Sequence, residues 1–302
     1  MKIARQSFFK NPEKDKAAFE SWKMKIVEKN GYSYDELWVE TSLGRTKVYG
    51  LNSSDTSRET LVVFPGFRTT TLIWDLNQGL SLIAKTHRIF MVETNGQPNL
   101  SEGNTPDIKG LGYGEWGKEI FDALKIQQAY ITGASFGGLV CMKIALVIPQ
   151  RIKAAILLNP GCFRYVSFGA KNMFYNLLPL IRLNRKNIQR FLNQVVFSQC
   201  EDRISSDWEA LLAEYLTLAI SAYKDNTQKP YPMGKQLRGV TVPTHLVLGK
   251  NDILLPYKKS LEKAEELLRG HLKSVHIENY GHGIELYPKA IRRIADIIKN
   301  EA

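Results

Sequence analysis

Residues 133–138 read Gly133-Ala134-Ser135-Phe136-Gly137-Gly138 and match the pattern G-x-S-x-G. The apolar run Ala129-Tyr130-Ile131-Thr132 leads into this stretch with strand character, and Leu139–Val147 continues from it with helical character. Glycines are needed around the serine because side chains would collide in a sharp strand-to-helix turn. The sequence therefore predicts that Ser135 is held above the edge of a sheet, beside the backbone NH of Phe136 at a helix N-terminus.

Short apolar runs of the buried-strand type recur on both sides of this turn. They lie at Thr60–Phe64, Arg88–Val92, Ala129–Thr132, Ala154–Asn159, Thr244–Leu248 and Ser274–Ile277. Segments of helical length separate most of them, which predicts an α/β fold with a mostly parallel sheet flanked by helices. Before them, Leu37–Thr41 and Thr46–Leu51 are expected to form a hairpin, and residues 11–30 a peripheral amphipathic helix.

The succession of strands stops for about eighty residues after the run that ends at Asn159. Helical patterns fill this stretch, notably at Ile188–Val196 and Trp208–Ala222. A loop of that length without structure of its own would be unusual inside a compact domain. We therefore predict a helical insertion, and the resulting domain boundaries are 1–161 and 239–302 for the core and 162–238 for the insertion.

A serine hydroxyl is a poor nucleophile at neutral pH, so Ser135 needs a histidine base and an acid that orients it. Among five histidines, His282 differs because it lies between two glycines in a loop after the last predicted strand. Asp252 follows the preceding strand, at the edge where sites of open α/β sheets lie, whereas Asn159-Pro160-Gly161 offers no carboxylate. The alternatives are an inert serine in a glycine-rich turn, a surface histidine and an aspartate that only stabilises a turn.

The chain order of serine, acid and histidine resembles that of the α/β-hydrolase superfamily. The resemblance runs from about Leu37 to Ile298 and covers Phe64-Pro65-Gly66-Phe67, the serine turn, Gly249-Lys250-Asn251-Asp252 and Gly281-His282-Gly283. It implies a serine esterase-like member of this fold. It also implies that the NH of Phe67 joins that of Phe136 in an oxyanion hole, and that the segment from about Cys162 to Arg238 caps the site.

Three sequence features distinguish the chain from parts of this superfamily. Many relatives have His-Gly where this chain has Pro65-Gly66, and many have Asp-x-x-Gly-x-Gly-x-Ser where it reads Glu93–Ser101. Haloalkane dehalogenases and epoxide hydrolases carry aspartate at the nucleophile position. Ser135 therefore argues against those two chemistries.

The resemblance implies acyl transfer from a small ester-like substrate to water, with Ser135 as nucleophile, His282 as base and Asp252 as its orienting acid. A carboxylesterase-like activity is the central expectation, and thioesterase, lactonase, amidase or carbon-carbon bond hydrolase activities are close alternatives. A ligand-binding signalling receptor of the same fold with little turnover is the rival from another class. No metal or organic cofactor is expected.

Composition excludes several other classes. With 302 residues, 44% hydrophobic and only 12 proline, the chain can build a sizeable core and is not a disordered protein. Three cysteines give no disulfide framework, which favours a reducing compartment. The first residues lack the apolar segment of a secretory signal and no segment is apolar enough to span a membrane, so a cytoplasmic location is expected.

The net charge of +11 is the one unusual compositional feature. Nucleic-acid binding is not expected, because no recognised motif accompanies the charge. Six of the excess charges lie in residues 162–190, which contain no Asp or Glu: Arg164, Lys171, Arg182, Arg185, Lys186 and Arg190. If this part of the insertion lies near the site, it would favour an anionic substrate or an anionic surface, whereas a solvated basic face is the simpler alternative.

Overall fold

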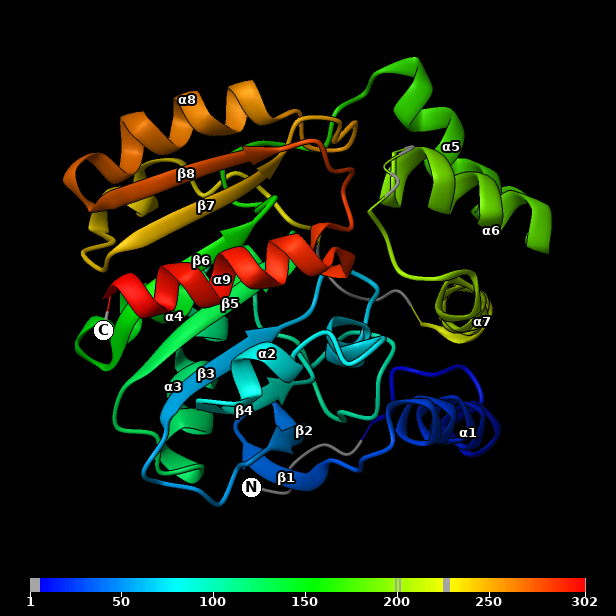
Figure 1. Cartoon of the computed structure of the whole chain (residues 1–302), viewed down its shortest axis with the longest axis horizontal. Helices are drawn as coiled ribbons and strands as arrows, with labels where there is room; N and C mark the ends of the chain where they lie inside the picture. Colours follow the sequence, from blue (N-terminus) through cyan, green and yellow to red (C-terminus); the bar gives the residue numbers. More distant parts are fainter. Residues whose placement is uncertain (1–5, 199, 201, 225–228, 302) are drawn as a thin grey trace.

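The computed structural model describes residues 6–198, 200, 202–224 and 229–301. One eight-stranded sheet with the order β1-β2-β4-β3-β5-β6-β7-β8 forms its centre (Figure 1). The strands are β1 (Asp35–Thr41), β2 (Gly44–Leu51), β3 (Glu59–Phe64), β4 (His87–Val92), β5 (Ala129–Ala134), β6 (Ile152–Leu158), β7 (Thr244–Gly249) and β8 (Leu272–Glu278). Each predicted strand is present, with ends within about two residues of the prediction. The apolar runs of β3, β4, β5, β6 and β7 are buried on both faces, whereas the edge strands β1 and β8 are partly exposed.

The sheet is mixed only at one edge. The predicted hairpin is confirmed, since β1 pairs antiparallel with β2 and β2 pairs antiparallel with β4. All further pairs are parallel, from β4 through β3, β5, β6 and β7 to β8. The carboxyl ends of these parallel strands therefore meet at one edge, where the predicted site residues follow them.

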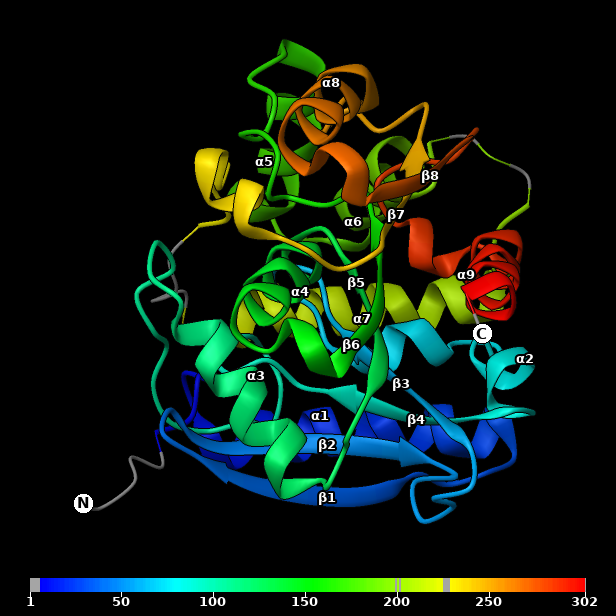
Figure 2. The same ribbon diagram turned by 90° about the vertical axis from the view of Figure 1, so that its left-hand side faces the viewer.

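Helices cover both faces, as the alternation of strands and helices predicts (Figure 2). Figure 2 shows α3 and α4 on one side of the sheet and α2 and α9 on the other. Along β3, Val62 and Phe64 belong to the core cluster on the side of α3 and α4. Leu61 and Val63 belong to the core cluster on the side of α9. The helices concerned are α2 (Ser81–Ala84), α3 (Gly112–Ala123), α4 (Phe136–Val147), α8 (Tyr257–Leu268), whose buried residues belong to the same core cluster as those of α4, and α9 (Pro288–Glu301).

The insertion between β6 and β7 is helical and lies beyond the carboxyl ends of the strands (Figure 1). It forms α5 (Ala170–Ile181), α6 (Arg185–Phe191) and α7 (Ser206–Ala222). The helix expected at Ile188–Val196 begins earlier, as α6, and its second half is a turn of π-helix, Leu192–Val196. A π-helical turn leaves backbone carbonyls out of the regular α-helical ladder, so other groups can bond to them.

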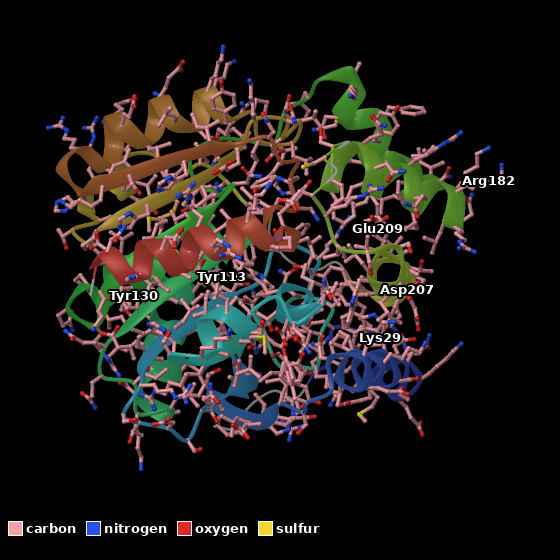
Figure 3. All side chains as sticks on the ribbon, in the orientation of Figure 1. Lys29, Tyr113, Tyr130, Arg182, Asp207 and Glu209 are labelled. Atoms are coloured by element: carbon pink, nitrogen blue, oxygen red, sulfur yellow. The ribbon has the colours of Figure 1, made fainter. Side chains whose placement is uncertain are left out.

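The N-terminal helix α1 (Pro12–Asn30) lies outside the sheet, as predicted, but it is firmly packed. It runs beside α7, where the Trp22 indole donates a hydrogen bond of 2.8 Å to the Leu211 carbonyl. Phe19 and Tyr215 pack edge to face in the same contact. Lys29 and Asp207 approach each other across it at 3.7 Å (Figure 3). The helix thus anchors the insertion to the core.

The turn after β5 brings three backbone segments into unusually close contact. A methyl group added at Gly137 would lie 2.4 Å from the Phe64 carbonyl oxygen and 2.8 Å from that of Pro65. One added at Gly133 would lie 2.4 Å from the Gly137 carbonyl carbon. Ser135 between them has φ 51° and ψ −108°, a conformation that non-glycine residues seldom adopt. The glycines therefore permit the strained turn that the sequence predicts.

We predict that Gly137→Ala lowers the free energy of unfolding by about 1–3 kcal/mol, because backbone atoms cannot move away from the added methyl group. The sign is informative, since alanine is favoured over glycine in an ordinary helical turn. Urea unfolding curves measure the change. Gly270→Ala is the control, because nothing lies within 4 Å of its added methyl group, and its effect should stay within about 0.5 kcal/mol. Equal stability of the two variants would contradict the close contact.

Candidate active site

Ser135 is tied by its backbone to the end of the neighbouring strand. Its NH donates to the Leu158 carbonyl at 2.9 Å, and its own carbonyl accepts from the Gly161 NH at 2.8 Å. The residue is partly exposed and directly precedes α4. These two main-chain bonds therefore fix the backbone of Ser135, which carries the hydroxyl, at the carboxyl edge of the sheet.

Asp252 and His282, predicted from separate loops, are in direct contact. The His282 Nδ1–H donates to Asp252 Oδ2 at 2.7 Å. Asp252 Oδ1 accepts from the backbone NH groups of Leu254 at 2.8 Å and Leu255 at 3.0 Å, so the buried carboxylate is well satisfied. Burial lowers the pKa of His282, but the charge and hydrogen bond of Asp252 outweigh it, so the pKa lies above its usual value.

The insertion holds the His282 loop by its backbone. The NH of His282 donates to the Val195 carbonyl at 2.8 Å, and that of Gly283 to the Val196 carbonyl at 3.1 Å, so the π-helical turn supplies both acceptors. A methyl group added at Gly281 would lie 2.5 Å from the Val196 oxygen. Gly281 is thus required by this close contact, and not by the free backbone that the sequence suggests, while a methyl group added at Gly283 would lie 2.4 Å from the Val196 Cγ1.

Asn159 connects the two loops that carry Asp252 and His282. Its Oδ1 accepts from the Gly249 NH at 2.7 Å, and its Nδ2 donates to the Gly281 carbonyl at 2.9 Å. Sequence reasoning considered this position only because it lacks a carboxylate. An asparagine at a strand end was the available signal, but its amide can bridge two loops only because the parallel pairing of β6 and β7 brings them together.

The two predicted oxyanion donors lie on adjacent turns. A methyl group added at Gly66 would lie 3.9 Å from the Ser135 Cβ, and the Phe67 and Phe136 rings pack edge to face with centroids 6.1 Å apart. Neither amide donates to an acceptor among the residues that the structure describes. The neighbouring Arg68 NH donates to Gln97 Oε1 at 2.6 Å, which fixes the Phe67 loop to the segment after β4.

The segment after β4 is a buried support under the site. Glu93, at its start, accepts hydrogen bonds from the Thr70 hydroxyl and, at 3.2 Å, from the Thr71 NH. Burial raises the pKa of Glu93 to about 8. The Tyr215 hydroxyl of α7 donates to the Pro98 carbonyl at 3.0 Å. Glu93–Ser101, which departs from the pattern of many relatives, therefore joins the Phe67 loop to the insertion.

A second carboxyl group lies close to the His282–Asp252 pair. Glu285 is buried, and its Oε2 has no hydrogen-bond partner among the described residues. Burial raises the pKa of Glu285 to about 7, and the negative charge of Asp252 acts in the same direction. Sequence reasoning missed Glu285, because a glutamate three residues after a histidine carries no signal of burial.

The structure places Ser135, Asp252 and His282 at the same edge of the sheet, but it shows no hydrogen bond between Ser135 and His282 among the described residues. In the described part of the chain, the Ser135 hydroxyl and the His282 ring share no hydrogen bond, whereas His282 and Asp252 do. Ser135 and His282 are both fixed to the end of β6, through Leu158 and through Asn159. Within the residues that the structure describes, no group of His, Cys, Asp and Glu side chains could hold a metal ion.

The family model described as alpha/beta hydrolase fold matches residues 59–220, more than half of the chain. The chain belongs to the alpha/beta hydrolase fold family. Membership was expected from the serine turn and the order of the site residues, and the mostly parallel sheet with its helical insertion agrees with it. Within the described ranges, no helix of this alpha/beta hydrolase has the length and apolarity to cross a membrane.

Several relatives resemble this alpha/beta hydrolase at low identity. The Bacillus subtilis protein named uncharacterized carboxylesterase nap is 23% identical over 258 residues, covering 82% of this chain and 81% of that protein. A 2-hydroxy-6-oxononadienedioate/2-hydroxy-6-oxononatrienedioate hydrolase of Cupriavidus pinatubonensis is 24% identical over 220 residues, covering 68% and 74%. The crystal structure of Bacillus subtilis carboxylesterase CesB (YbfK) matches with a TM-score of 0.76 at 18% identity, covering 95% and 99%.

We predict that Glu93→Gln removes part of the pH dependence of the free energy of unfolding. A glutamate with a raised pKa stabilises the fold fully below its unfolded pKa of about 4.5, and this stability is lost as the pH rises toward about 8. One such group changes the free energy of unfolding by at most about 1.4 kcal/mol per pH unit. Urea unfolding at pH 5, 6.5 and 8 should show a flatter dependence in the variant. The exposed Glu262→Gln is the control, and identical slopes in all three proteins would contradict the pKa of Glu93.

Proposed function

We propose that this alpha/beta hydrolase is a serine hydrolase that cleaves small carboxylic esters through an acyl-enzyme. The observation that carries the proposal is the 2.7 Å contact of His282 with the buried Asp252, at the sheet edge where Ser135 projects from a strained turn. Two carboxylesterases of Bacillus subtilis resemble the chain over most of its length. Under this proposal, residues 162–238 are the cap of a core formed by 1–161 and 239–302.

In the proposed mechanism, Ser135 Oγ attacks the ester carbonyl carbon while its proton passes to His282 Nε2. Asp252 keeps the other ring proton on Nδ1, which leaves Nε2 free to accept, and stabilises the imidazolium that forms. The imidazolium then protonates the departing alcohol. Water attacks the acyl-enzyme in the second half of the reaction, and His282 again takes and returns the proton. The contact of Ser135 with His282 is expected to form when substrate is bound.

The amides of Phe67 and Phe136 would stabilise the oxyanion of the tetrahedral intermediate. They belong to adjacent turns beside Ser135, and both are without acceptors among the described residues. Each such donor typically contributes about 3 kcal/mol to the stability of the transition state. The Phe136 amide also begins α4, so the helix dipole favours the developing negative charge there.

We predict that a fluorophosphonate probe labels the wild-type protein and that Ser135→Ala abolishes labelling, because the probe bonds to an activated serine. In p-nitrophenyl ester hydrolysis, kcat/KM should fall about ten-thousandfold or more for Ser135→Ala and His282→Ala, and about as much for Asp252→Asn. Ser54→Ala, at an exposed serine, is the matched control. Labelling that persists in Ser135→Ala would contradict the nucleophile assignment.

The same assay separates the proposed activity from its alternatives. Repeated release of p-nitrophenol supports an esterase, whereas a single equivalent without turnover would indicate a ligand receptor. The resemblance to a 2-hydroxy-6-oxononadienedioate hydrolase makes carbon-carbon bond hydrolysis the second candidate reaction. Turnover of a 2-hydroxy-6-oxo-dienoate with no turnover of esters would replace the proposed reaction by that one. Thioesters, lactones and amides are assayed in parallel to rank the acyl donors.

We predict that Glu285→Gln moves the rise of kcat/KM with pH toward lower pH. Activity requires neutral His282, and the negative charge of Glu285 helps to hold the pKa of His282 above its usual value. Because glutamine carries no charge, His282 should lose its proton at lower pH in the variant. The pH profile of ester hydrolysis measures the midpoint, with Glu262→Gln as control. A midpoint that stays in place would show that Glu285 does not influence His282.

A further inference from the structure

Helix α5 presents its apolar side to the outside of the molecule. Its exposed apolar residues are spaced at i, i+1, i+4, i+7 and i+8, which places them along one side of the helix: Met173, Phe174, Leu177, Leu180 and Ile181. Ile181 is 79% exposed and Phe174 57%, whereas Asn172 and Pro179 on the other side are buried. The loop before the helix adds Tyr165, Val166 and Phe168, and Phe168 is 83% exposed.

The stretch of chain that carries this apolar side contains cations and no carboxylates, since residues 162–190 include no Asp or Glu. The six basic residues of 162–190 make no ion pair with any residue that the structure describes, and five of them are exposed: Lys171, Arg182, Arg185, Lys186 and Arg190. Figure 3 shows Arg182 at the outer edge of the molecule, extending away from the core. Unpaired exposed cations next to exposed aromatic and aliphatic groups are unlike an ordinary solvated face, where charges of both signs alternate.

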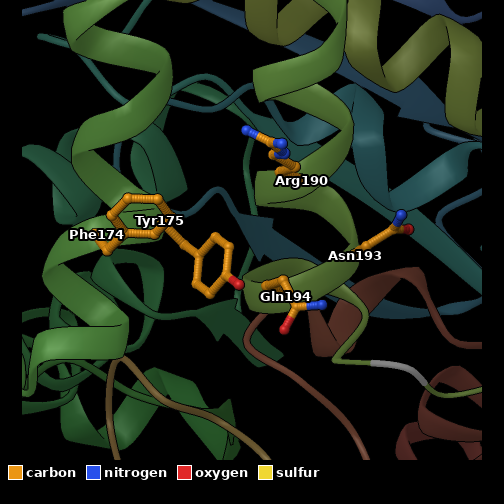
Figure 4. A pocket seen from close by; sticks show the side chains of 5 residues that line it. All are labelled: Phe174, Tyr175, Arg190, Asn193 and Gln194. Carbon is orange, nitrogen blue, oxygen red and sulfur yellow. The ribbon is translucent and has the colours of Figure 1, made fainter.

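The apolar and basic groups form one continuous surface. Between α5 and α6 lies a cavity of about 380 Å³, lined by Phe174, Tyr175, Arg190, Asn193 and Gln194 (Figure 4). An adjoining open cavity of about 630 Å³ shares Arg190 and Asn193 and continues to Arg185 and Lys186. The outward side of α5 with these α6 residues is called the outer cap surface below. Its cavities offer guanidinium and amide donors of the kind that phosphate oxygens accept.

We propose that the outer cap surface docks the protein on an anionic lipid surface. The apolar side chains of α5 would enter the boundary between headgroups and acyl chains, and the surrounding cations would bind the lipid phosphates. An amphipathic helix with a basic border and aromatic and aliphatic side chains binds membranes in this way, parallel to the surface. The sequence left an anionic substrate and an anionic surface open, and the outward exposure of these cations favours the surface.

Charge argues against a second copy of the chain as the occupant. A symmetric dimer through this surface would place the same unpaired cations of both copies opposite each other, and residues 162–190 carry no carboxylate to compensate them. An anionic bilayer supplies the missing negative charge and also accepts the apolar side chains. An anionic bilayer can therefore bind both the cations and the apolar side chains of the outer cap surface.

The test is co-sedimentation with vesicles of phosphatidylcholine alone and of equimolar phosphatidylcholine and phosphatidylglycerol. We expect binding to the anionic vesicles that weakens with added salt. Replacing Arg182, Arg185 and Lys186 by Gln should weaken it about a hundredfold, since each cation near such a surface contributes about fivefold. Leu177→Ser with Ile181→Ser should weaken it about tenfold or more.

The control is Leu82→Ser with Lys85→Gln, an exposed apolar residue of α2 and the exposed basic residue that directly follows this helix, both outside the cap. This variant should bind as the wild type does. Ser135→Ala should also bind normally, so docking can fail or succeed independently of the proposed esterase activity. Three results would overturn the proposal: no preference for anionic vesicles, equal binding of cap and control variants, or a dimer in sedimentation velocity that Leu177→Ser with Ile181→Ser dissociates.

Discussion

The backbone contact between Gly137 and the end of β3 is the constraint on which the site depends. Because Gly133 and Gly137 carry no side chains, the turn after β5 packs directly on the Phe64 and Pro65 carbonyls. This contact places Ser135 and the first residue of α4, Phe136, beside the loop of Phe67. A larger residue would separate the two turns, and with them the proposed nucleophile Ser135 and the proposed oxyanion donor Phe67.

The cap is part of the site and not a separable cover. Carbonyls of the π-helical turn hold the His282 loop, and Tyr215 of α7 binds the buried segment after Glu93. Helix α1 in turn fixes α7 through Trp22. The histidine position therefore depends on contacts among α1, the cap and two loops of the core, most of them between residues far apart in the sequence.

The strands and the serine turn could be predicted from the sequence because local patterns determine them: apolar runs, glycine spacing and chain order. The pairing of Asp252 with His282 followed from topology, since both loops leave the same sheet edge. The bridging amide of Asn159 and the buried carboxyl of Glu285 could not be predicted, because each gains its role from long-range contacts. Gly281 was noticed for the wrong reason, since it is required by the close approach of the Val196 carbonyl of the cap, which lies far earlier in the chain.

The two sides of the cap meet different requirements within one short stretch of chain. Helix α6, whose basic residues face outward, continues directly into the π-helical turn whose carbonyls accept from His282 and Gly283. The outer residues are free of ion pairs among the described residues, whereas the inner ones are fixed by hydrogen bonds. A displacement of α6 would therefore move the acceptors that position His282, so the outer cap surface and the His282 loop depend on the same helix.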